Sequence, residues 1–178
     1  MAFSIQDMKD TINTDGYLHA ANYEVIVIPP AAVGGGELLR IRAESVSLPG
    51  VSFASVDGYK AYGTGKTYSV PHTFTPAAVA VNHLIDNSGE VLKILNDWSN
   101  KIVDFRGAGD GRYTASYFST YVVDADIVLY GSDQQIVKTI KLYDMYPSTV
   151  DQVQMSWGSS DELAKVSVQY QFVDYTIS

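Results

Sequence analysis

The strongest constraint in this sequence is the alternation of apolar and polar residues near its C-terminal end. A period of two places alternate side chains on opposite faces of a β-strand. The apolar face of this segment consists of Ala164, Val166, Val168, Tyr170 and Phe172, and the polar face of Lys165, Ser167, Gln169 and Gln171. One face is therefore expected to pack on a core while the other stays in water.

A similar alternation precedes this segment. Val153, Met155 and Trp157 alternate with Gln152, Gln154 and Ser156, and the turn-rich residues 158–161 follow. We therefore predict a long β-hairpin over residues 142–175. Its polar face carries uncharged glutamine and serine, whereas Lys and Glu normally solubilise an exposed sheet face.

Composition favours a β-rich chain with one core. The 178 residues are 46% hydrophobic, which suits one domain over residues 1–178 better than two. With 13 tyrosines and no cysteine, packing and strand pairing are expected to stabilise the fold, rather than disulfides or thiolate-bound metal. A net charge of −8 with only 12 Lys and Arg residues argues against a surface that grips nucleic acid.

Residues 1–20 are expected to form a polar N-terminal arm. Ile5, Met8 and Ile12 have the spacing of a short docking helix, and a frayed arm is the alternative. The segment has the pattern of neither a signal peptide nor an anchor, and no later stretch reaches a membrane-spanning length. We therefore expect a soluble protein made in the cytoplasm, with no membrane partner.

Two strands are expected in the first quarter of the chain. Residues 23–28 read YEVIVI and end at two prolines, which cannot donate to a strand ladder. The glycine-rich residues 31–37 are expected to be a hairpin connection, and residues 37–47 a returning strand. The triple glycine is followed by no Lys-Thr pair and no helix signal, which argues against a phosphate-binding loop.

Residues 51–75 are rich in glycine and tyrosine and predict a protruding hairpin with a mobile tip. Gly65, Lys66 and Thr67 resemble the end of a Walker A loop, but Lys60 stands where that motif needs glycine. Such a tip is a natural partner contact, and a plain solvated loop is the alternative.

One long helix is expected. Asn87 and Glu90 resemble a capping box, and Val91, Leu95, Trp98 and Ile102 follow at helical spacing. Residues 105–112 are expected to be a loop, and residues 121–130 and 134–146 a hairpin joined by residues 131–133. Strands, one helix and further strands predict a mainly β (α+β) fold, an antiparallel β-sandwich or barrel with one flanking α-helix. The expected core anchors are Trp98, Trp157, Leu95, Val166, Val168 and Tyr170.

Residues that would carry chemistry are sparse. His19, His72 and His83 are isolated in the sequence, and no metalloprotease or nucleophile-elbow motif is present. Asp124 and Asp126 share a strand face and offer a cation site, but a solvated or intersubunit face is favoured. We therefore expect no enzyme, no catalytic residue, no metal and no cofactor.

A structural role suits the pattern better. Long strands with one uncharged polar face, a covering helix and a protruding hairpin are explained if the sheet continues from one subunit into the next. Closing such a sheet into a ring removes its exposed edges and leaves a polar lumen. A small-ligand-binding β-barrel is a competing hypothesis, but it needs a cavity lined by large apolar residues.

The order of landmarks resembles that of a known family. A strand at AANYEVIVI and one ending at Leu48-Pro49 precede the glycine- and tyrosine-rich segment and the helix with Trp98. The chain then closes with YPSTV at residues 146–150, a strand ending at Trp157, a short turn, and a final strand ending at Asp174-Tyr175. From about residue 20 to 175 the chain resembles the tail tube proteins of contractile-tailed bacteriophages.

The resemblance implies a virion protein that is assembled in the host cytoplasm. Subunits of this family form hexameric rings that stack into the inner tail tube, and their strands join an intersubunit β-barrel. The implied partners are the contractile tail sheath protein, the baseplate tube initiator and the tail terminator, with the tape measure protein and genomic DNA in the lumen. A baseplate tube initiator and the inner-tube subunit of a bacterial contractile injection system share the fold and remain alternatives.

The resemblance also suggests roles for individual residues. Because DNA must slide through the tube during ejection, uncharged walls are expected to line the bore. The expected lumen-facing residues are Gln152, Gln154, Ser156, Ser167, Gln169 and Gln171. In this family the N-terminal arm and the long hairpin typically reach the neighbouring ring, and the expected inter-ring contacts are Asp57, Tyr59, Lys60, Tyr62 and Lys66.

Overall fold

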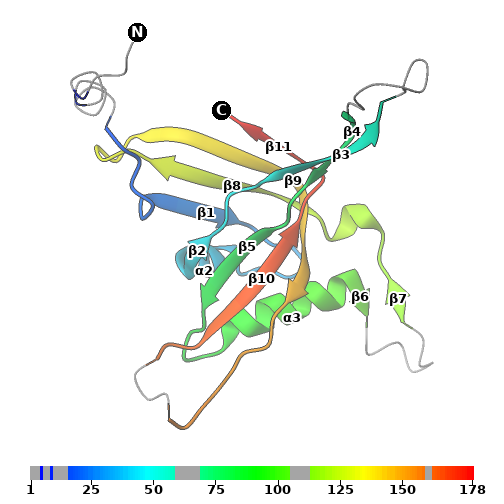
Figure 1. Ribbon diagram of the computed structural model, residues 1–178. Coiled ribbons are helices and arrows are strands. Elements are labelled where there is room, and N and C mark those ends of the chain that lie inside the picture. The colour runs from blue at the N-terminus through cyan, green and yellow to red at the C-terminus, as the bar shows by residue number, and fades with distance from the viewer. Residues whose placement is uncertain (1–4, 6–8, 10–15, 59–68, 105–112, 159–161) are drawn as a thin grey trace.

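A computed structural model describes residues 5, 9, 16–58, 69–104, 113–158 and 162–178. All strand pairs are antiparallel, and the main sheet has the order β1-β8-β9-β10-β5-β2, with β11 also paired to β9 (Figure 1). The strands of this sheet are β1 (Tyr23–Val27), β2 (Ala43–Val46), β5 (Val79–Leu84), β8 (Val123–Tyr130), β9 (Ile136–Val150), β10 (Lys165–Gln171) and β11 (Asp174–Ile177). The predicted mainly β fold with one flanking helix is confirmed.

The remaining elements lie outside this sheet. They are the hairpin β3 (Val51–Asp57) and β4 (Ser69–Pro76), the short pair β6 (Val103–Asp104) and β7 (Thr114–Ala115), the helices α2 (Gly36–Ile41) and α3 (Glu90–Ile102), and the 3-10 turn η1 (Phe118–Thr120).

Strand β9 belongs to two halves of the sheet. Its first part lies between β8 and β11, and its last part pairs with β10. The change occurs near Asp144, whose φ of 52° is unusual for a residue other than glycine. There β9 carries an extra residue relative to β8, and the Asp144 backbone N–H donates to Asp124 Oδ1 at 3.4 Å. This β-bulge turns the long strand from one half of the sheet into the other.

The core lies between the sheet and α3. Val166, Val168 and Tyr170 of β10 are completely buried, as the C-terminal alternation predicted. The Trp98 ring packs 6.0 Å from that of Tyr170, and its indole N–H donates to the Tyr121 carbonyl at 2.8 Å. Leu95 is buried beside them on the same helix face. Five of the six predicted core anchors therefore lie in the core.

Trp157 is the exception. The prediction that it anchors the core is wrong, because its side chain is fully exposed at 106%. The chain leaves the sheet after Val150, and the last hydrogen bond to β10 runs from the Asp151 N–H to the Ser167 carbonyl. Residues 151–156 are therefore not a strand, and their alternation does not set which way their side chains point. Only Val153 of this segment packs against the core.

The predicted strand over residues 37–47 is also wrong in its first half. Residues 36–41 form α2, and only residues 43–46 form a strand. The helix begins after two glycines with positive φ, and a Cβ on Gly35 would lie only 2.3 Å from Ile94 Cδ1 of α3. Arg40 of α2 forms an ion pair with Glu24 of β1 at 2.6 Å. Packing against α3 and this ion pair hold the short helix in place. Neither contact can be predicted from the strand propensity of the segment.

The expected capping box at Asn87 is absent. Gly89, with a φ of 70°, occupies the N-cap of α3 and provides no side chain. The Asp86 carboxylate instead accepts a hydrogen bond from the Val91 N–H at 3.3 Å, and its pKa is lowered chiefly by the Ser88 hydroxyl. The predicted helix and its buried face are nevertheless confirmed.

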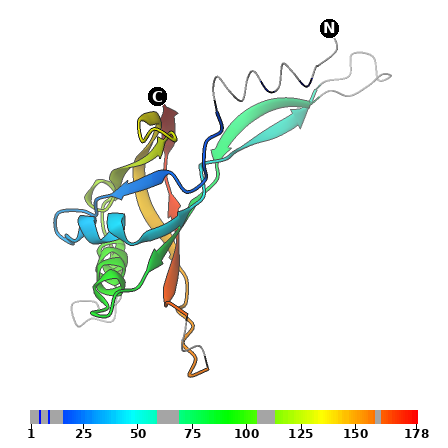
Figure 2. The same cartoon turned by 90° about the vertical axis from the view of Figure 1, so that its left-hand side faces the viewer.

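The predicted protruding hairpin is confirmed as β3 and β4. It continues the β2–β5 ladder through two hydrogen bonds, from the Ser47 N–H to the Ala80 carbonyl and from the Ala77 N–H to the Gly50 carbonyl, both at 2.8 Å. Figure 2 shows it projecting from the body of the molecule. Its tip, residues 59–68, lies outside the described residues, as do residues 105–112 and all but Ile5 and Lys9 of residues 1–15.

Candidate assembly surfaces

The face of β10 opposite the core is polar and half-exposed or exposed. It carries Ser167, Gln169 and Gln171, three of the six residues predicted to face a lumen. Cross-strand pairing extends this face over the neighbouring strands. Ser167 lies opposite Asn82 of β5, which in turn lies opposite Ser45 of β2. The Asn82 side chain donates to Ser45 Oγ at 2.8 Å, so a row of uncharged polar groups crosses three strands.

The charges on this face neutralise each other. Lys165 Nζ of β10 lies 2.5 Å from Glu44 Oε1 of β2, across the intervening strand β5. The next row along β10 contains no charge, since Gln169 lies opposite Thr149 of β9 on one side and Ala80 on the other. The polar face of the sheet thus has little net charge although the chain as a whole carries −8.

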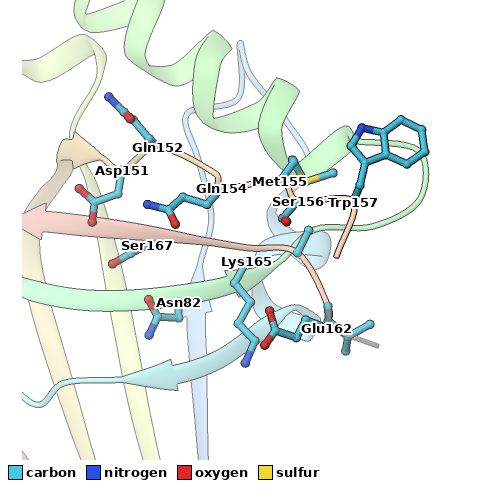
Figure 3. A pocket seen from close by; sticks show the side chains of 12 residues that line it. Asn82, Asp151, Gln152, Gln154, Met155, Ser156, Trp157, Glu162, Lys165 and Ser167 are labelled. Carbon is cyan, nitrogen blue, oxygen red and sulfur yellow. The ribbon is translucent and has the colours of Figure 1, made fainter. Parts of the chain in front are cut away.

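The other three predicted lumen residues line a groove beside this face. Gln152, Gln154 and Ser156 lie on the segment between β9 and β10, and Ser167 and Asn82 form the opposite wall (Figure 3). The groove has a volume of about 1290 Å³ and is open to solvent. The structure therefore brings Gln152, Gln154, Ser156 and Ser167 together, while Gln169 and Gln171 lie farther along β10.

The four strands that carry the polar face end in two edges. In the part of the chain that the structure describes, β2 is paired only with β5, and the last four residues of β9 only with β10. An unpaired strand edge offers a row of backbone donors and acceptors to another strand. The two edges lie on opposite sides of the same half of the sheet, which is the arrangement that a sheet shared between neighbouring subunits needs.

The β3–β4 hairpin exposes apolar side chains. Phe53 and Phe74 lie opposite each other with ring centroids 6.3 Å apart, and both are largely exposed. A two-stranded hairpin with no further layer is only marginally stable in water. Of the predicted inter-ring contacts, Asp57 ends β3, and Tyr59, Lys60, Tyr62 and Lys66 lie outside the described residues.

One histidine has a strongly altered environment. His83 is completely buried in β5, with Nε2 3.2 Å from the Tyr170 hydroxyl. Burial lowers the pKa of His83 to about 4 and raises that of Tyr170. Because His83 lies in the core and does not line the groove, its role is in packing.

The described residues contain no group of three His, Asp or Glu side chains placed to hold a metal ion. Asp124, one of the two aspartates considered for a cation, lies 3.5 Å from Lys141 Nζ. Within the described parts of the chain, no helix has both the length and the apolar character needed to cross a bilayer. Among the described residues, the polar face, its two edges and the exposed apolar side chains are candidate surfaces for assembly.

Comparison with known proteins decides the family. The model of a phage tail tube protein family matches residues 18–178. The chain belongs to that family. No curated protein sequence matches it significantly.

Solved structures with a similar fold include chains of an anti-feeding prophage and of an extracellular contractile injection system. The chain is similar to a chain of the "anti-feeding prophage (AFP) baseplate, 6-fold symmetrised", with a TM-score of 0.66 and 9% identity over 91% of this chain and 95% of that one. It is also similar to a chain of the sheath-tube complex of PVC, an extracellular contractile injection system, with a TM-score of 0.64 and 12% identity over 99% of both chains. The AFP tube terminating cap gives a TM-score of 0.62 and 13% identity over 91% of both chains. At these identities the likeness concerns the fold alone.

Sequence reasoning missed several members of this tail tube protein's polar face. Asn82, Ser45 and the Lys165–Glu44 ion pair come from strands far apart in sequence. The alternation in residues 79–84, where Val79, Val81 and His83 are buried, was the available signal for β5. The pairing of β5 with β10 was not readable from either segment alone.

Proposed function

We propose that this chain is the repeating subunit of an inner tail tube, with its strands shared between six subunits of a ring. The single observation that carries this proposal is the four-stranded half-sheet, whose polar face has little net charge and whose two edges pair with no further strand among the described residues. Pairing the β2 edge of one subunit with the β9 edge of the next extends the sheet around a ring. Closure then removes both edges from solvent.

The polar face then forms the wall of the bore. Phosphate groups of a passing DNA would bind a basic wall at every ring, and the attraction would add up along the tube. Ser167 and Gln169 offer hydrogen bonds without charge, and Glu44 neutralises Lys165. Gln152, Gln154 and Ser156 would lie at the rim of the bore, and Gln171 at the far end of β10.

The proposed partners follow from this role. The subunit would be a single domain whose N-terminal arm and β3–β4 hairpin reach the next ring. A contractile sheath would surround the tube, a terminator would cap one end, and a baseplate initiator would start the other. A tape measure protein and genomic DNA would lie inside. The site of action is the virion tail, assembled in the host cytoplasm, and the chain has no enzymatic role.

A second candidate is the inner-tube or baseplate subunit of a contractile injection system. The similarity to chains from a baseplate structure, a sheath-tube complex and a tube-terminating cap structure is nearly equal, with TM-scores of 0.66, 0.64 and 0.62, which supports this second candidate. Such a tube would carry protein cargo rather than DNA. Only a repeating subunit is expected to form long tubes on its own, so self-assembly separates it from a baseplate initiator.

The test is the oligomeric state of the purified protein over a range of concentrations. Native mass spectrometry should show hexamers that convert to longer species as concentration rises. A compact monomer at all concentrations would refute the ring.

A second experiment addresses the bore. Arginines at Gln154 and Gln169 should leave tubes intact but slow DNA ejection, because each ring gains positive charge facing the DNA. Lysine-to-arginine exchange at Lys138, on the other half of β9, is the control that keeps net charge constant. Normal DNA ejection through Q154R/Q169R tubes would show that this face does not line the bore.

A further inference from the structure

The connection between β9 and β10 exposes large apolar side chains. Met155, Trp157 and Leu163 are 80%, 106% and 71% exposed. Figure 3 shows the Trp157 indole projecting away from the other side chains that line the groove. Tryptophan is enriched among the residues that dominate binding energy at protein interfaces, and exposed apolar patches mark interaction surfaces. These three residues are called the apolar loop patch below.

The second exposed apolar surface is on the β3–β4 hairpin. Val51, Phe53 and Phe74 are 44%, 64% and 44% exposed, and cross-strand pairing places them on one face. This set is called the arm patch. Ala54, next to Phe53 in β3, points to the opposite face of the hairpin.

The two patches lie at opposite ends of the molecule. In Figures 1 and 2 the hairpin extends from one end of the sheet, and the β9–β10 connection hangs from the other. Neither patch can therefore cover the other within one chain. Copies stacked in the same orientation would bring the arm patch of one against the apolar loop patch of the next, which is a head-to-tail interface.

The surroundings of the loop patch suit such a contact. The adjoining groove is lined by Asp151, Glu162 and Lys165 as well as by the three apolar residues. Protein interfaces commonly combine apolar side chains with polar ones at the rim. Copies that each carry −8 repel one another at a distance. Burial of apolar surface offsets this repulsion, and these two patches are placed to supply it.

We propose that Trp157 and its neighbours are the receptor for the β3–β4 hairpin of a second copy of this chain in the adjacent ring. The inference rests on the proposed function, since it requires stacked rings. The inference adds which surface receives the hairpin. From the sequence, Trp157 was expected in the core, and the neighbouring Gln154 and Ser156 in the bore. Trp157 packs against Phe53 and Phe74 of the incoming hairpin, and the polar groups of the adjoining groove lie to one side of this contact.

The first test compares assembly with stability. Trp157→Ala and Phe53→Ala should each raise the concentration needed for tube formation about tenfold or more. The melting temperature of the single chain should not change, because both side chains are already exposed. The double variant should be little worse than either single one, because both remove the same contact. Trp157→Phe, which keeps an aromatic ring, should recover most of the assembly.

The second test uses the absence of cysteine from the chain. The variant F53C/W157C, treated with a short bismaleimide after assembly, should give a ladder of linked chains that extends beyond the size of one ring. The matched control A54C/W157C places the first thiol on the opposite face of the hairpin and should link poorly.

The outcomes separate this inference from the function on which it rests. Suppose that the wild-type protein forms tubes but the F53C/W157C variant gives no ladder, or a ladder that stops at the size of one ring. That result would overturn the inter-ring receptor and leave the proposed tube function intact. Equal linking by the A54C control would also overturn it. Failure of the wild-type protein to form any tubes would overturn both.

Discussion

Acidification should destabilise the folded chain through His83. This side chain is completely buried beside Tyr170, and burial lowers its pKa from 6.5 to about 4. The unfolded state therefore binds a proton at a higher pH than the folded state does. Stability is fully present above about pH 6.5 and falls as the pH decreases toward 4.

The gap between the two pKa values sets the magnitude. A difference of about 2.5 corresponds to about 3 kcal/mol, at about 1.4 kcal/mol for each pKa unit. A small domain is stable by only about 5–15 kcal/mol, so this loss is a substantial part of the total. The carboxylates of Glu24 and Asp86 also have lowered pKa values, and they lose stabilising interactions as they protonate. The contribution of His83 must therefore be obtained by difference.

The assay is urea unfolding at several pH values, below the concentration at which the protein assembles. His83→Gln keeps an amide near the Tyr170 hydroxyl but does not titrate, so its stability should fall about 3 kcal/mol less between pH 6.5 and 4 than that of the wild type. His72→Gln, at an exposed position on β4, should follow the wild type. If the free energy of unfolding depends on pH in the same way for the wild type and His83→Gln, His83 is not the source of the acid destabilisation.

Three further predictions concern stability and are measured by denaturant or thermal unfolding of the single chain. Trp98→Ala should cost about 3–5 kcal/mol, because it empties a fully buried site and removes the hydrogen bond to Tyr121; a loss under about 1 kcal/mol would contradict the assigned core. Trp157→Ala should change stability by less than about 0.5 kcal/mol, since the side chain is exposed, and a large loss would mean that it packs within the chain. Gly35→Ala should cost more than Gly34→Ala, because both positions have positive φ but only the first Cβ would meet Ile94; equal losses would remove the role of that close approach.

The sequence predicted well wherever pattern and packing agree. The period-two alternation in residues 164–172 correctly assigned the buried face of β10, because a two-sided strand with one buried face allows only one register. The spacing of Val91, Leu95 and Trp98 likewise identified the buried face of α3. The projecting hairpin was recognisable from its turn-rich, strand-forming composition.

The errors have a common physical origin. In residues 152–157 the alternation continues, but the chain has left the sheet after Val150, so Trp157 points into solvent rather than into the core. Residues 36–41 contain leucine and isoleucine, which are compatible with a strand as well as with a helix. Contacts with α3 and Glu24 favour the helix. The local pattern of apolar and polar residues does not reveal such long-range contacts, or contacts with other subunits.

The same limit applies to the polar face. Gln169 and Ser167 were identified from one strand, but the neutralising partner of Lys165 lies on β2, 121 residues away in sequence. That the face is nearly uncharged as a unit becomes visible only when the three strands are side by side. This property, more than any single residue, is what the proposed bore requires.

Cryo-electron microscopy of tubes grown from the purified protein would show how the subunits are joined and which face lines the bore. We expect stacked rings of six subunits, with β2 of each subunit paired to the end of β9 of its neighbour. The face with Ser167 and Gln169 should surround the bore, and α3 should lie on the outside. Tubes with α3 facing the bore, or subunits joined without strand pairing at these two edges, would rule out the proposed shared sheet.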